Sequence, residues 1–354
     1  MAVITTSVFE LLKIGPGPSS SHTMGPMKAG RDFHQLLKGL TPAELAGATG
    51  LQVHLYGSLA ATGKGHGTDR AILAGLMGYD PEDCPPDILD VIRLDPRSPL
   101  TLEIGPQRFP FRHADMVYHE GAGDFPFSNT MIIRLSGPQG SILEKEYYSV
   151  GGGFIQWQGW QESARGLPRY PYENATQLTK LLKKHRLGLP EIMMANERAI
   201  TGRSEKEIND GLDRVITAME EAVQRGLTTE GYLPGPIRLH RKGPLFFQRA
   251  RGMSQSAERL LVYLCAYAFA AAEENAAGHR VVTAPTCGSA GVIPALICLL
   301  RRHGKIPLEK VRRALLAAAA VGFIAKHNAS ISGAEVGCQG EIGVAASMGA
   351  ALVA

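Results

Sequence analysis

The chain has 354 residues, of which 44% are apolar and 20% charged, an ordinary composition for a globular protein of about two domains. Its net charge of +4 is small and its basic residues are scattered, which argues against a nucleic-acid-binding surface. The sequence shows no secretory signal, no apolar run of the roughly 20 residues that a membrane helix needs, and five cysteines without paired spacing, so we expect a cytoplasmic protein that spans no membrane and keeps its thiols reduced.

Helix and strand patterns are mixed in the first 154 residues. Apolar residues spaced by three and four predict helices, and alternating apolar and polar residues predict half-buried strands. The expected elements are, in chain order, a short helix opened by a capping box at 7–10, a helix over 26–37, a strand over 51–56, a helix from Arg70 with Asp69 as its N-cap, and strands over 131–135 and 142–150 joined by a turn at 136–140.

The pattern changes after three consecutive glycines at 151–153. Residues 155–174 are rich in tryptophan, glycine and proline and predict a linker. Beyond residue 175 the periodic segments are helical, for example over 204–222, 253–277 and 308–326. We therefore expect an α+β protein with an N-terminal α/β domain over 1–154 and an all-helical C-terminal domain over 175–354.

A hydroxyl-rich loop precedes the helix expected over 26–37. It contains Ser19, Ser20, Ser21, His22 and Thr23, following Gly15-Pro-Gly-Pro18. Hydroxyls and backbone N–H groups at the start of a helix suit a carboxylate or a phosphate. A capped turn with a surface histidine is an equally good interpretation from the composition alone.

A glycine-rich loop is expected between the strand over 51–56 and the helix from Arg70. It does not match a phosphate-binding P-loop, because five residues separate Gly57 from Gly63 and another glycine follows the lysine. The loop offers Lys64, His66 and Asp69, and a histidine with a pKa near neutral suits proton transfer.

Two cysteines stand in loops of small and polar residues. Cys338 lies between glycines before an expected helix, which favours a thiolate. Cys287 is a ligand candidate or a small buried residue, and a lone cysteine is often part of the core. Neither has the C-x-x-C spacing typical of metal sites, and Cys84, Cys265 and Cys298 are expected to be structural.

Taken together, these segments resemble the iron–sulfur-dependent L-serine dehydratases, in the single-chain arrangement with a β domain followed by an α domain. The similarity runs in order through the whole chain, and its last motif is long and specific. The motifs that carry it are 17–30, 56–69, 148–154, 228–236, 274–278, 281–286 and 328–341.

The resemblance implies a lyase that converts L-serine to pyruvate and ammonia in amino-acid degradation. It implies a [4Fe-4S] cluster held by three cysteines, whose open iron acts as a Lewis acid on the serine hydroxyl. Cys338 would be one cluster ligand and His66 the base, with Lys64 and Asp69 around it. Ser19 to Thr23 would hold the substrate carboxylate. A homodimer is also implied.

The sequence departs from this family in one respect. Family members continue beyond the position of Ala354, and their other two cluster cysteines lie in that continuation. The resemblance therefore leads us to expect a truncated chain, with Cys287 as a doubtful substitute ligand.

Two alternatives stay open. The chain could be an inactive fragment, or one half of a split enzyme that lacks two cluster ligands. A pyridoxal-phosphate serine dehydratase would perform the same net reaction, but it needs a Schiff-base lysine and a phosphate-binding loop in a doubly wound sheet. We expect no pyridoxal phosphate. Whether serine or threonine is preferred is left open by the sequence.

Overall fold

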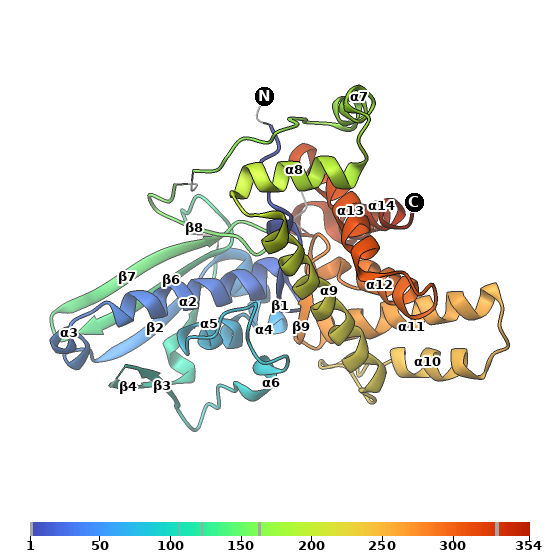
Figure 1. Cartoon of the computed structure of the whole chain (residues 1–354). Coiled ribbons are helices and arrows are strands. Elements are labelled where there is room, and N and C mark those ends of the chain that lie inside the picture. The colour runs from blue at the N-terminus through green and yellow to red at the C-terminus, as the bar shows by residue number, and fades with distance from the viewer. Residues whose placement is uncertain (1–2, 106, 122, 162–163, 330–332) are drawn as a thin grey trace. The chain divides into compact units, whose positions relative to one another are not determined.

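The computed structural model describes the chain except for residues 1–2, 106, 122, 162–163 and 330–332, and it describes only the backbone of 333–336 and Cys338 (Figure 1). Contacts divide the chain into two compact units. The sheet unit comprises residues 15–161 and 278–280, and the helical unit comprises residues 1–14, 162–277 and 281–354. The expected fold class, α/β in the N-terminal part and helical in the C-terminal part, is confirmed. The boundaries expected at 1–154, 155–174 and 175–354 stay a prediction.

A five-stranded sheet forms the centre of the sheet unit, with the strand order β5-β2-β6-β7-β8. Strand β2 pairs with β5 in parallel, and the other neighbours pair antiparallel. The turn expected at 136–140 connects β6 and β7. A separate hairpin contains β3 and β4. The strands are β2 (Gly50–Leu55), β3 (Leu100–Ile104), β4 (Gln107–Phe111), β5 (Met116–Tyr118), β6 (Thr130–Gly137), β7 (Gly140–Ser149) and β8 (Ile155–Trp157).

Helices α2 and α5 supply most of the helical part of this unit's core. Phe33 and Leu37 of α2 are fully buried together with Val53 and Leu55 of β2, because alternate residues of the strand face the core. The helices are α2 (Gly25–Lys38), α3 (Pro42–Ala46), α4 (Gly57–His66), α5 (Thr68–Leu76) and α6 (Ile88–Val91); residues Ser20–Met24 form a π-helical turn and His113–Asp115 a 3₁₀ turn.

Two expectations for residues 57–69 were wrong. The segment is helix α4 followed directly by α5, not a flexible loop, and Asp69 lies in the first turn of α5 and is not its N-cap. Gly57 begins α4 at φ +53°, where a Cβ would lie 2.1 Å from the carbonyl oxygen of Ser128. The glycines lower the local helix propensity, but the fully buried Leu59 shows that packing against the sheet overrides it.

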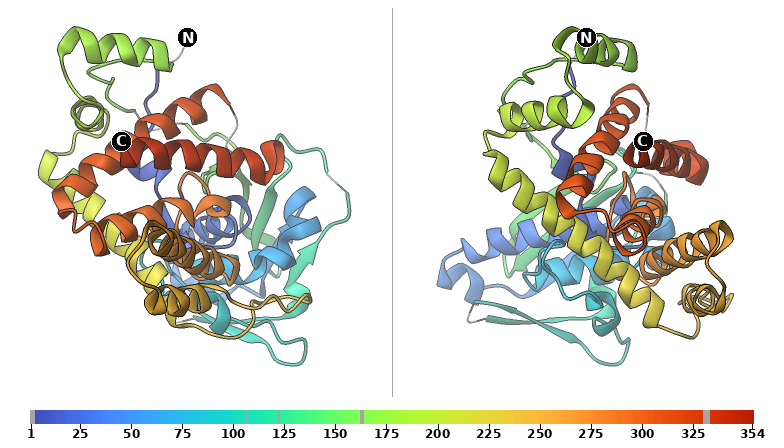
Figure 2. Two further views of the ribbon diagram at one scale, coloured as in Figure 1. Left: turned by 90° about the vertical axis from the view of Figure 1, so that its right-hand side faces the viewer. Right: turned by 45° about the vertical axis from the view of Figure 1, so that its right-hand side comes forward.

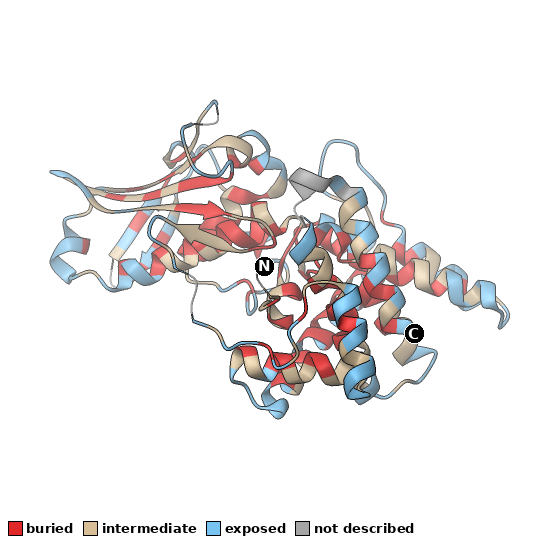
Figure 3. Cartoon of the chain, turned by 90° about the horizontal axis from the view of Figure 1, so that it is seen from above, coloured by how far each residue is buried: buried red, intermediate tan, exposed pale blue. Residues whose placement is uncertain are grey.

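The helical unit contains one short and eight longer helices among its described residues. Figures 1 and 2 show α10 and α11 as an antiparallel pair, and Figure 3 shows the helices buried on one side and exposed on the other. The helices are α1 (Val8–Leu11), α7 (Ala175–His185), α8 (Leu189–Thr201), α9 (Glu205–Thr228), α10 (Gly243–Gly252), α11 (Ala257–Ala276), α12 (Val292–Arg302), α13 (Leu308–Asn328) and α14 (Gly333–Val353). Strands β1 (Ile14–Pro16) and β9 (Arg280–Val282) lie where the chain passes between the units.

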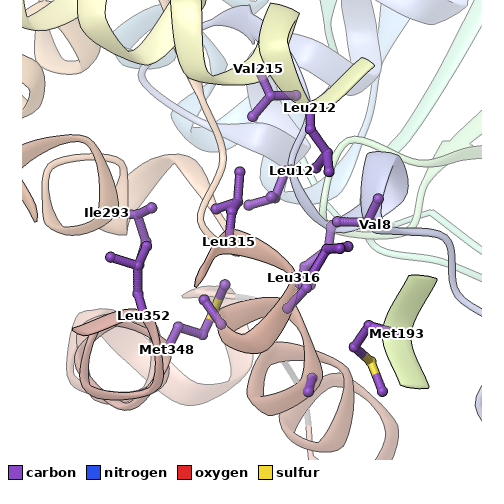
Figure 4. Close-up of a cluster of buried hydrophobic side chains, with 14 of the residues drawn as sticks. Val8, Leu12, Met193, Leu212, Val215, Ile293, Leu315, Leu316, Met348 and Leu352 are labelled. Carbon is purple, nitrogen blue, oxygen red and sulfur yellow. The ribbon is translucent and has the colours of Figure 1, made fainter. Parts of the chain in front are cut away.

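The first residues of the chain belong to the core of the helical unit. Val8 and Leu12 are buried among side chains of α9, α13 and α14, which come much later in the sequence (Figure 4). The capping box predicted at 7–10 is present, with the Ser7 hydroxyl accepting from Phe9 N and the Glu10 carboxylate accepting from Ser7 N. This core also holds Met348 and Leu352 of α14.

Candidate active site

The hydroxyl-rich segment predicted from the sequence forms a compact turn in the sheet unit. Ser19 has extended backbone angles and caps the π-helical turn, because its hydroxyl accepts a hydrogen bond from His22 N over 3.1 Å. The Thr23 hydroxyl in turn accepts from Ser19 N over 3.3 Å. Ser20 and Thr23 are buried, so the turn is part of the folded core and not a surface loop.

His22 is buried and hydrogen-bonded through both ring nitrogens. Nδ1 lies 2.9 Å from the Ser21 hydroxyl, and Nε2 lies 2.9 Å from the hydroxyl of Ser58. Burial, followed by the charge of the nearby His66, lowers the pKa of His22 to about 4. The imidazole of His22 is therefore neutral at physiological pH.

His66 lies next to His22, with 4.8 Å between the ring centroids. Its Nδ1 is 2.9 Å from the carbonyl oxygen of Thr62, one turn earlier in α4. A carbonyl only accepts hydrogen bonds, so Nδ1 of the neutral ring carries the proton and Nε2 carries the lone pair. The hydrogen bond to Thr62 thus directs Nδ1 of His66 to its own helix, so Nε2 is the nitrogen that can accept a proton.

Two hydroxyl groups connect the turn to the junction of α4 and α5. Thr68 donates to the carbonyl oxygen of His22 over 2.5 Å, and Thr23 donates to the carbonyl oxygen of His66 over 2.9 Å. These bonds bring together segments that are more than 40 residues apart in the sequence. The predicted residues from Ser19 to Thr23 and His66 therefore form one cluster.

Lys64 and Asp69 share a different neighbour, Tyr118 of β5. The Lys64 Nζ lies 4.8 Å from the centre of the Tyr118 ring. Burial, and then the negative charge of Asp69, raises the pKa of Tyr118. Asp69 Oδ1 is buried, and no described residue forms a hydrogen bond with it. Lys64 thus lies over Tyr118 and the charge of Asp69 acts on it, and no contact among the described residues links either side chain to that of His66.

Three members of this cluster were not predicted as site residues from the sequence. Ser58 holds Nε2 of His22, Thr68 holds its carbonyl group, and the Ser149 hydroxyl donates to the carbonyl oxygen of Ser21 over 2.7 Å. Ser58 and Thr68 lie in the motif at 56–69, and Ser149 lies in the motif at 148–154. Only their place in these motifs pointed to a role in the site. Their partners are distant in the sequence and could not be identified from it.

A second candidate region lies in the helical unit, at residues 283–289. Cys287 is fully buried there, and burial, followed by the charge of Glu341, raises the pKa of its thiol, whereas Lys13 opposes the increase. The Thr286 hydroxyl donates to Glu341 Oε1 of α14 over 2.5 Å. A buried thiol with a raised pKa favours the protonated form, which is a poor metal ligand.

The predicted ligand Cys338 belongs to α14, but its side chain lies outside the described residues. Gly337, just before it, has φ 67° and ψ 179° and interrupts the helix, so the residues after it start a new helical segment. Within the described part of the chain, no three His, Cys, Asp or Glu side chains form a group that could hold a metal ion. The described cysteines Cys84, Cys265, Cys287 and Cys298 are all free thiols.

The order of the two units along the chain is that of a known family. The model of the serine dehydratase beta chain matches residues 7–160, and the model of the serine dehydratase alpha chain matches residues 184–354. The chain belongs to the serine dehydratase family, as its motifs predicted.

Several curated relatives resemble the chain over almost its whole length. L-serine dehydratase TdcG of Escherichia coli K12 is 40% identical over 98% of this chain and 77% of its own length. An L-serine dehydratase of Streptomyces coelicolor is also 40% identical, over 98% of this chain and 78% of its own. That of Haemophilus influenzae is 38% identical over 98% and 77%. Among the described residues, no helix is both long and apolar enough to cross a membrane.

Proposed function

We propose that this protein is an L-serine dehydratase that converts L-serine to pyruvate and ammonia. Its membership of the family and the names of its relatives support this activity. The observation that carries it in the structure is a pair of neighbouring histidines beside a turn of hydroxyl groups. One is neutral and buried, and no described residue forms a hydrogen bond with Nε2 of the other. We also propose that the protein works in the cytoplasm as a homodimer.

The reaction needs a base for the Cα proton and a way to release the hydroxyl group. Removal of the proton and departure of hydroxide leave aminoacrylate, which tautomerises to iminopyruvate. Water then hydrolyses the imine to pyruvate and ammonia, so the water lost in the first step is consumed in the last. Because the Cα proton is only weakly acidic, the protein must supply a positioned base.

His66 is the proposed base, acting through Nε2. The hydrogen bond from Nδ1 to the Thr62 carbonyl fixes the tautomer in which Nε2 is unprotonated. His22 is less suited, because both of its ring nitrogens are already within 2.9 Å of a hydroxyl group. We assign Lys64 and Asp69 a supporting role around Tyr118, which does not require direct contact with His66.

The turn from Ser19 to Thr23 is the proposed carboxylate-binding segment. It combines hydroxyl groups with the N-terminal end of the π-helical turn that runs into α2, and the N–H groups at such an end favour an anion. The neutral His22 supports this role indirectly, since its two ring nitrogens orient the hydroxyl groups of Ser21 and Ser58. The ties from Thr68 and Ser149 keep the turn in one conformation.

A [4Fe-4S] cluster with Cys338 as one ligand is the proposed cofactor. When bound, an open cluster iron supplies Lewis-acid assistance to the departing hydroxyl group. The described residues do not offer the full ligand set, because Cys287 is a buried thiol and the described cysteines form no group. The assignment of the cluster therefore depends on the family resemblance and on Cys338 alone.

The test is anaerobic treatment of the purified chain with iron and sulfide, followed by an assay of pyruvate formed from L-serine. We expect turnover in the wild-type chain and a loss of about 100-fold or more in kcat for His66→Gln, the usual range for removal of a general base. His113→Gln is the matched control, because His113 is an exposed histidine of the same unit. Equal turnover of wild type and His66→Gln would remove the base assignment, and no pyruvate from any variant would contradict the proposed activity of this chain.

A further inference from the structure

Helix α14 carries a buried stripe that ends in a carboxylate. Ala345, Met348 and Leu352 are buried and are spaced by three and four residues, as on one face of a helix. Glu341 stands four residues before Ala345 and so continues the same face. The spacing of the buried residues predicts an apolar side chain at position 341. A glutamate there is expected to have a specific hydrogen-bonding partner.

That partner is the segment from Thr283 to Ser289. The Thr286 hydroxyl donates to Glu341 Oε1 over 2.5 Å. The other oxygen, Oε2, lies so close to Gly288 that a Cβ at this glycine would be 2.3 Å from it. No described lysine or arginine forms an ion pair with Glu341. The neutral Thr286 hydroxyl donates to its carboxylate, and Gly288 leaves the space that the carboxylate occupies.

The segment itself is firmly anchored on its other side. The Thr283 hydroxyl donates to the Leu11 carbonyl oxygen over 2.8 Å and accepts from Lys13 N over 2.8 Å. Thr283 N donates to the Lys13 carbonyl oxygen, also over 2.8 Å. The Ser289 hydroxyl closes the segment by donating to the Ala284 carbonyl oxygen over 2.9 Å. Glu341 therefore binds to a part of the unit that has little freedom to move.

Cys338 stands three residues before Glu341, directly after the break at Gly337. Because Gly337 is not helical, the turn that begins at Cys338 is not a rigid extension of the preceding residues. We propose that Glu341 is a positioning residue, which fixes the Cys338 turn against residues 283–289 through its hydrogen bond with Thr286. The inference rests on the proposed function, in which Cys338 is a metal ligand.

The test is the alkylation rate of Cys338 in iron-free, reduced protein, measured by peptide mass spectrometry. Thr286→Val removes the donor while keeping the shape, and Gly288→Ala crowds the carboxylate. We expect both to raise the rate at Cys338 by roughly fivefold or more, as for the loss of one hydrogen bond. Thr286→Ser keeps the hydroxyl and should restore the wild-type rate. The buried Cys298 serves as the internal reference for folding.

Equal rates at Cys338 in the wild type, Thr286→Val and Gly288→Ala would overturn the proposal. If Cys298 becomes reactive in Thr286→Val, that variant is unfolded and Glu341→Gln takes its place, with a smaller increase expected because an amide accepts a weaker hydrogen bond than a carboxylate. Alkylation requires neither cluster nor turnover, so faster labelling in a chain that forms no pyruvate would uphold the positioning role while contradicting the proposed function. In chains that do take up iron and sulfide, Thr286→Val should bind less iron than Thr286→Ser.

Discussion

His22 and His66 show how surroundings give two identical side chains different chemistry. His22 is surrounded by hydroxyl groups in a buried turn, which removes water from the ring and makes its protonated form costly. His66 is tied by Nδ1 to its own helix, which leaves Nε2 available. His22 is therefore the neutral histidine that orients hydroxyl groups, and His66 is the histidine suited to accept a proton.

The lowered pKa of His22 has a consequence for stability. Because the folded-state pKa of about 4 lies below the ordinary 6.5, the unfolded chain binds a proton in this pH range that the folded chain does not. Above pH 6.5 the residue contributes no pH dependence, and stability falls as the pH drops from 6.5 towards 4. His22→Gln should therefore lose less stability than the wild type between pH 7 and pH 5, by about 2 kcal/mol.

Urea unfolding at both pH values, followed by tryptophan fluorescence, measures this difference. Comparing each protein with itself at the two pH values cancels any pH-independent cost of the substitution. The same pH dependence in His22→Gln and in the wild type would contradict the assignment of a buried, neutral His22.

The crossing of α2 and α5 depends on two glycines that bring the helix backbones together. A Cβ at Gly30 would lie 2.3 Å from the Ile72 carbonyl oxygen, and a Cβ at Gly75 would lie 2.1 Å from the Met27 carbonyl oxygen. Any larger residue must therefore push the helices apart. Since α2 begins directly after the hydroxyl-rich turn, this close packing also supports the candidate site.

Gly30→Ala is expected to lower the free energy of unfolding of the sheet unit by about 1–3 kcal/mol or more, because it overpacks the crossing. Gly65→Ala is the matched control: it is a helical glycine at which a Cβ would meet no atom within 4 Å. The control should be neutral or more stable by up to about 1 kcal/mol, from the better helix propensity of alanine. Both tryptophans, Trp157 and Trp160, lie in the sheet unit, so fluorescence during urea unfolding reports this difference. Equal losses in the two variants would show that the crossing is not tightly packed.

For the molecule as a whole, the first residues of the chain fold with residues that follow the sheet unit. The Ser7 hydroxyl donates to Glu197 Oε1 over 2.5 Å, and Val8 N donates to Oε2 over 2.9 Å. Leu12 is buried in the core of the helical unit (Figure 4). The helical unit is therefore discontinuous in sequence, and its core depends on both ends of the chain.

Leu12→Ala should lower the stability of the helical unit by about 2–5 kcal/mol, the usual cost of a large-to-small substitution in a core. Leu167→Ala, at a leucine of the same unit that is 76% exposed, should change it by less than about 0.5 kcal/mol. Circular dichroism at the helical minimum follows the transition of this helix-rich unit. No difference between the two variants would mean that the first residues do not contribute to its core.

The family, the fold class and the elements that depend on neighbouring residues could be predicted from the amino-acid sequence. The capping box at Ser7, the alternation of β2 and the turn between β6 and β7 were predicted because each depends on residues within a few positions of one another. The helix at 57–66, the hydrogen bond between His22 and Ser58 and the hydrogen bond from Thr286 to Glu341 became visible only in the folded chain. These partners are 36 and 55 residues apart, and contacts over such separations leave no periodic pattern in the sequence. Only the packing of the folded chain selects them, because burial makes each unpaired polar group costly and so requires a specific partner.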